Sequence, residues 1–97
     1  MTSATKNRKL NRMTNYMEEL AGDALTDLLS EYKHARFSSD AIRDIKALAL
    51  NRLWPMYITT TTGKDFLKKV VEEDQIEKDI VRELRAAIDI VRSNPRR

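Results

Sequence analysis

Apolar side chains recur at steps of three and four residues through the first third of the chain. They stand at Leu10, Met13, Met17, Leu20, Ala24 and Leu28. Acidic residues fall between them and would cover the opposite face, which is the pattern of an amphipathic helix. We therefore predict a helix from about Leu10 to His34.

A second helix is predicted over residues 40–53. Its apolar positions are Ile42, Ile45, Ala47, Leu48, Ala49, Leu50 and Leu53, so its middle is apolar almost all round. A helix of this kind usually packs on more than one side, and we predict that it is the central helix of the fold. Ser38 or Ser39 supplies the N-cap. The helix must end near Trp54, because the residue before Pro55 is pushed out of the helical region.

The segment Met56–Thr62 has strand-like propensity, with four consecutive threonines. It is too short and solitary to form a sheet, so we predict a loop, with pairing to a second copy of the chain as the alternative. Thr62 and Asp65 resemble a capping box, after which helical spacing continues to about Ser93. The apolar stripe is interrupted near residues 73–74, which indicates either a kink or a junction between two helices.

Composition supports a helical fold. The chain has 97 residues, two glycines, two prolines and no cysteine, and 34% of its residues are charged. We predict an all-α protein, a compact bundle of about four helices in one domain over residues 13–94. Residues 1–12 carry four bases and no acid. We interpret them as a flexible basic arm, although contact with phosphate or anionic lipid is the alternative.

The residues needed for catalysis are absent. His34 is the only histidine, there is no cysteine nucleophile, and no glycine-rich phosphate loop is found. We therefore expect no enzymatic activity, no metal and no cofactor. The basic N-terminus lacks the apolar stretch of a secretory signal, and no apolar run approaches the length of a membrane span. The expected location is the cytoplasm.

The most unusual segment is Asp44–Thr59, which reads DIKALALNRLWPMYIT. One interpretation is structural: Asn51 and Arg52 satisfy the last carbonyls of a helix, while Trp54 and Tyr57 cover the core. The other is a ligand site. An arginine can bind phosphate with two hydrogen bonds or stack on a base, an asparagine can read a base edge, and threonine hydroxyls can bind phosphate oxygens.

The same segment resembles the signature of the ComFB family, the late competence development proteins of bacteria. The family pattern is an acidic and an aliphatic residue followed by A-L-A-L-N-[RK]-[LV]-x-P-x-Y-[VA]-[TS]. This chain follows it from Asp44 to Thr59, except that Lys46 stands before Ala47 and Ile58 takes the [VA] position. The resemblance implies a helical homodimer that binds cyclic dinucleotides, cyclic di-GMP in particular, in competence, type IV pilus or motility signalling. Some members hold zinc through cysteines between the first two helices. Residues 35–39 contain none here, so zinc is not expected.

The resemblance carries over a set of polar site candidates. They are Asn51, Arg52, Tyr57 and Thr59. Charge and location add a further set, namely Arg36, Arg43 and Lys64, and from the basic arm Arg8 and Arg12. The leading hypothesis is a dimeric cyclic di-GMP receptor that changes the binding of an unknown protein partner. A nucleotide-independent protein–protein adaptor is the second hypothesis. A nucleic-acid binder that uses the basic arm is disfavoured, because the rest of the chain is nearly neutral.

Overall fold

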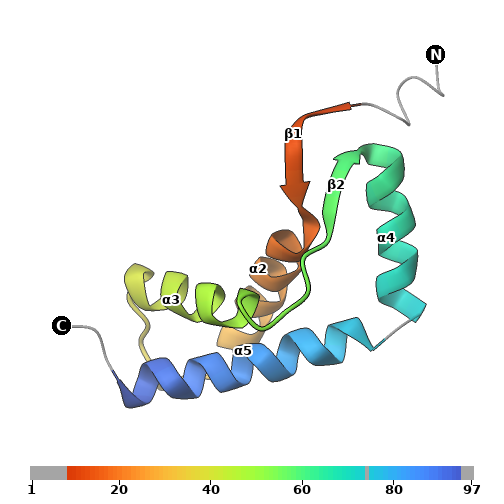
Figure 1. Ribbon diagram of the computed structural model, residues 1–97. Helices are drawn as coiled ribbons and strands as arrows, with labels where there is room; N and C mark the ends of the chain where they lie inside the picture. The colour runs from red at the N-terminus through yellow and green to blue at the C-terminus, as the bar shows by residue number, and fades with distance from the viewer. Residues whose placement is uncertain (1–8, 74, 95–97) are drawn as a thin grey trace.

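The computed structural model describes residues 9–73 and 75–94, which form four helices and a two-stranded antiparallel sheet (Figure 1). The elements in chain order are β1 (Lys9–Asn15), α2 (Tyr16–Leu29), α3 (Ser39–Leu50), β2 (Tyr57–Thr60), α4 (Thr61–Glu73) and α5 (Ile76–Ser93). The prediction of a mainly helical fold with about four helices is confirmed for these residues. The prediction that the fold is entirely helical is wrong.

The sheet pairs β1, which was predicted as the start of a helix, with β2, which was predicted as a loop. Asn15 lies opposite Tyr57 and Thr14 opposite Ile58, with an irregularity before the pair formed by Lys9 and Thr60. The helix predicted from Leu10 therefore begins only at Tyr16, and the segment predicted as a loop forms β2. The strand β1, which pairs with β2, could not be recognised from the sequence. Its apolar residues continue the helical spacing of α2, and that spacing also fits a strand that runs directly into a helix. Residues 9–12 of the basic arm belong to β1, and Arg8 lies outside the described residues.

Asn15 fixes the corner where β1 passes into α2. Its side-chain Oδ1 accepts a hydrogen bond from the backbone N–H of Met17 at 3.1 Å, which caps α2, and another from the backbone N–H of Met56 at 2.7 Å. The backbone N–H of Tyr16 donates to the carbonyl of Met56 at 2.6 Å. An amide oxygen has two lone pairs, so one side chain can both cap the helix and bind the chain before β2.

Replacing Asn15 with alanine is expected to lower the free energy of unfolding by about 2 kcal/mol, because two backbone donors lose their acceptor. The matched control is Ser38→Ala. The Ser38 hydroxyl accepts one hydrogen bond, from the backbone N–H of Ala41, and its loss should cost about 1 kcal/mol. Urea denaturation of both variants measures the difference. Equal losses would contradict the double role of Asn15.

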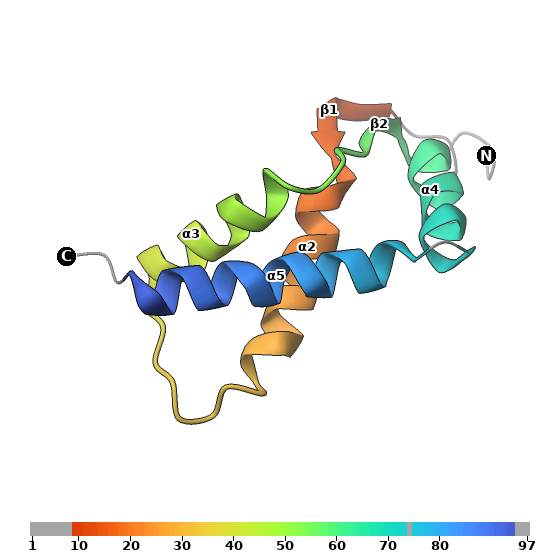
Figure 2. The same cartoon turned by 60° about the horizontal axis from the view of Figure 1, so that its bottom comes forward.

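The core forms where α2, α3 and α5 meet, and α5 is its central helix because it contacts α2, α3 and α4 (Figure 2). Its buried residues are Ile80, Leu84, Ala87 and Ile88. The helix predicted over 40–53 does pack on more than one side, since α3 contacts both α2 and α5. The prediction that it is the central helix is wrong, since α3 buries only Ile45 and Ala49 and leaves Ala47 exposed. The apolar pattern of α3 does not imply a central position, because an alanine offers little apolar surface and can face solvent at small cost.

The observed ends of the helices differ in part from the predicted boundaries. Ser38, one of the two predicted candidates, is the N-cap of α3, but the helix ends at Leu50 and residues 51–53 form a turn. The predicted capping box at Thr62 is wrong: α4 begins at Thr61, and the Thr60 hydroxyl, two residues before Thr62, accepts from the backbone N–H of Gly63 at 3.0 Å. The interruption near residues 73–74 is a junction between α4 and α5.

Candidate functional site

Asn51 and Arg52 line a groove of about 700 Å³ between α3 and α5. They lie in the turn that directly follows α3, so the end of that helix carries both side chains to the edge of α5. The other residues of the groove are Leu48 from α3 and Arg82, Glu83, Ala86, Ala87 and Ile90 from α5. Leu48, the two alanines and Ile90 make the floor apolar, and the polar side chains form its rim. An apolar floor with a few polar groups is typical of a small-molecule site.

Glu83 holds the two arginines of the rim. Its carboxylate accepts a hydrogen bond from Nε of Arg52 at 3.0 Å and lies 3.5 Å from Nε of Arg82. Nη1 of Arg82 also donates to Asp79 at 3.0 Å. The Glu83 side chain is only 14% exposed, whereas that of Arg52 is 71% exposed. Because a guanidinium carries five N–H groups, both arginines keep donors for an anion while Glu83 orients them.

Tyr57 and Arg12 lie together at a different place, in a hollow of about 530 Å³ beside the strand pair. Glu18 and Glu19 also line this hollow, so its charge disfavours phosphate. Lys64 is bound nearby, with Nζ 3.0 Å from a carboxylate oxygen of Glu19.

Tyr16 lies beneath Lys64, whose Nζ is 5.4 Å from the centre of the tyrosine ring. Burial raises the pKa of Tyr16, the negative charge of Glu19 raises it further, and Lys64 opposes the shift. The phenol is therefore neutral at physiological pH, where it serves as a flat apolar surface under the Lys64 cation.

The remaining predicted residues are spread over the molecule. Arg36 lines a third hollow, of about 350 Å³, with Phe37 and Arg92. Arg43 on α3 and Thr59 on β2 are exposed and do not line any of these three hollows. One chain thus brings Asn51 together with Arg52, and Arg12 with Tyr57, but does not assemble all the predicted residues into one site.

Two residues of the α3–α5 groove, Arg82 and Glu83, were missed in the sequence. For Arg82, the sequence does contain a signal: Arg82, Ala86 and Ile90 are four residues apart, so a positive charge lies at one end of a weakly apolar helix face. The structural interpretation of Trp54 and Tyr57 as a cover for the core is wrong, because the two residues retain 87% and 59% of their accessible surface.

These features define a small, mostly helical module with a two-stranded sheet and an arginine-rimmed groove. The family model for the late competence development protein ComFB matches residues 14–95. The chain therefore belongs to the ComFB family, which is a competence-related family. No curated protein sequence matches the chain. Within the described residues, the helices lack the combination of length and apolar character that crossing a bilayer requires.

Proposed function

We propose that this protein is a cytoplasmic receptor for cyclic dinucleotides, cyclic di-GMP in particular, and that it binds its ligand without catalysing a reaction. The observation that carries the proposal is the family signature, whose Asn51-Arg52 pair lines the α3–α5 groove. The receptor would act in competence, type IV pilus or motility signalling and pass the signal to a protein partner.

The groove residues suit the chemistry of such a ligand. Arg52 and Arg82 would bind the phosphates, since Glu83 already holds both guanidiniums at the rim. The apolar floor would receive a guanine ring, and the Asn51 amide would donate to or accept from its edge. Each charged hydrogen bond contributes about 1.5–3 kcal/mol, so two arginine contacts would supply about 3–6 of the roughly 8 kcal/mol that a micromolar Kd requires, and base contacts would supply the rest.

The proposal includes a homodimer. A cyclic dinucleotide has two bases and two phosphates in a nearly two-fold arrangement, which matches the symmetry of a dimer. Exposed apolar side chains are consistent with a second copy of the chain: Met13 on β1, Tyr57 on β2 and Phe66 on α4 are all more than half exposed. α4 itself buries only Val71.

A thermal-shift screen tests the function. Cyclic di-GMP at about 100 times its Kd should add about 2.7 kcal/mol of stability and raise the Tm by about 10–20 °C. Cyclic di-AMP tests whether the protein distinguishes guanine from adenine, and linear pGpG tests whether the ligand must be cyclic. A second salt concentration measures how much the phosphate charges contribute to binding. If no cyclic dinucleotide raised the Tm at either salt concentration, the proposal would be wrong and the adaptor hypothesis would replace it.

A further inference from the structure

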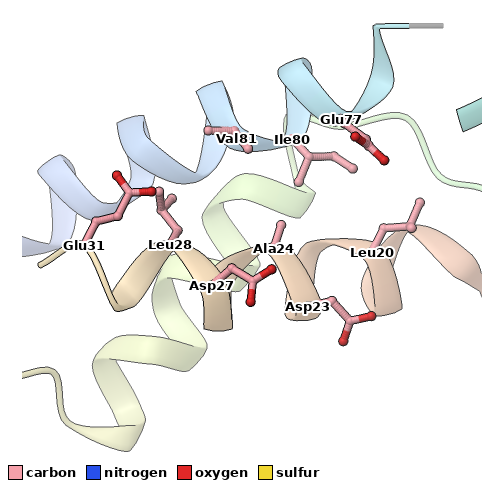
Figure 3. A pocket seen from close by; sticks show the side chains of 9 residues that line it. All are labelled: Leu20, Asp23, Ala24, Asp27, Leu28, Glu31, Glu77, Ile80 and Val81. Carbon is pink, nitrogen blue, oxygen red and sulfur yellow. The ribbon is translucent and has the colours of Figure 1, made fainter. Parts of the chain in front are cut away.

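A second groove, of about 350 Å³, runs between α2 and α5 (Figure 3). Its floor is apolar and consists of Leu20, Ala24 and Leu28 from α2 with Ile80 and Val81 from α5. The three α2 residues are spaced four apart, so they form one ridge along the helix. Leu20, Ala24 and Val81 remain partly exposed, which leaves apolar surface open to a partner.

The rim of this groove is formed by four carboxylates, on Asp23, Asp27, Glu31 and Glu77, with no lysine or arginine among the lining residues. In Figure 3 the Asp23 and Asp27 carboxylates point away from α5, on the outer side of the apolar ridge. Glu31 is bound to Arg85 at 2.9 Å. Among the described residues, the other three carboxylates are in no ion pair, so the rim keeps a net negative charge.

We propose that the α2–α5 groove binds a basic amphipathic helix of a protein partner. The apolar stripe of that helix would lie on the Leu20, Ala24 and Leu28 ridge, and its lysines or arginines would pair with Asp23, Asp27 and Glu77. Leu20 to Glu31 spans about 17 Å, which is three helical turns and suits a short helix. Nucleic acid and anionic membranes are disfavoured as partners, because the rim would repel their phosphates.

This inference goes beyond the proposed receptor function and does not depend on it. The α2–α5 groove is formed by different residues from the α3–α5 groove, although both use α5. A failure to bind nucleotide would therefore not contradict the proposed docking surface. A failure to bind the peptide would likewise not contradict the proposed nucleotide groove. If both are right, α5 is the element through which the two sites would communicate.

Fluorescence anisotropy with a synthetic peptide tests the docking surface on the full chain. The probe is a labelled amphipathic helix of about 12 residues, with a leucine stripe flanked by lysines, matched to the length of the groove. A scrambled peptide of the same composition keeps the charge and loses the stripe. The intact amphipathic peptide should bind, and the scrambled one should bind at least about tenfold more weakly, because only the first can bury leucines.

The variant Asp23→Asn/Asp27→Asn should weaken binding of the amphipathic peptide at least about tenfold, because two charged pairs are lost without a change in side-chain volume. The control is Glu72→Gln/Glu73→Gln, which removes two exposed carboxylates from α4 outside the groove and should leave the affinity unchanged. Circular dichroism verifies that both variants are folded.

Four results would overturn the proposal. Three are an absence of binding to the wild-type protein, equal binding of the two peptides, and equal losses in the two double variants. The fourth is binding that emerges only when Lys6 and Arg8 are replaced by glutamine in the full chain. In that case the occupant would be the basic N-terminal segment of the protein itself and not a partner.

Discussion

Replacing Leu84 with alanine is expected to lower the free energy of unfolding by about 3 kcal/mol, measured by urea denaturation. Leu84 lies on α5 and has no exposed surface. It belongs to the cluster in which α5 meets α2 and α3, together with Leu25 and Ile45. Removal of three carbon atoms there leaves a cavity that the surrounding helices can fill only partly, so the loss exceeds the transfer free energy of the deleted groups.

The matched control is Leu67→Ala. Leu67 is half-buried on α4, outside the core cluster, and its truncation should cost about 1 kcal/mol. A domain of this size is usually stable by only about 5–15 kcal/mol, so the Leu84 variant would lose a large share of its stability. Equal losses at Leu84 and Leu67 would show that α4 is as much part of the core as α5.

Much of the helical content could be predicted because apolar periodicity and caps are local signals. The N-cap at Ser38, the break between α4 and α5 and the end near Ser93 all follow from neighbouring residues. The sheet could not be predicted in the same way, since the pairing of Asn15 with Tyr57 joins residues far apart in the chain. Periodicity indicates that a helix has an apolar face, but not how many neighbours cover it, so it could not distinguish α3 from α5 as the central helix.

The candidate site was predicted in part for a similar reason. Asn51 and Arg52 follow one another at the end of a helix, so they necessarily lie together. Arg82 and Glu83 complete that groove from a helix about thirty residues later, and no local pattern links them to Arg52. Charge and location in the sequence are the grounds for predicting Arg36 and Arg43, and the fold places neither of them on the α3–α5 groove.

Replacing Arg52 with alanine is expected to weaken cyclic di-GMP binding at least about tenfold without unfolding the domain. An arginine contact to phosphate contributes about 1.5–3 kcal/mol, and tenfold corresponds to about 1.4 kcal/mol. The fold should tolerate the change, because Arg52 is 71% exposed and the mostly buried Glu83 carboxylate keeps its contact with Arg82. Arg82→Ala should have a comparable effect, since Arg82 stands on the same rim.

The control for both variants is Arg43→Ala, which removes an exposed arginine from α3 without touching the groove. It should bind cyclic di-GMP with unchanged affinity. A tenfold loss at Arg43 with none at Arg52 would move the site to the outer face of α3, away from the α3–α5 groove.

Calorimetric titration of cyclic di-GMP into the wild-type protein and into Arg52→Ala tests the central claim most directly. The claim predicts saturable heat with the wild type and a Kd at least about tenfold higher for the folded variant. The absence of saturable heat with the folded wild type would contradict the receptor function. An equal Kd for the two proteins would contradict the assignment of the site to the groove that Arg52 lines.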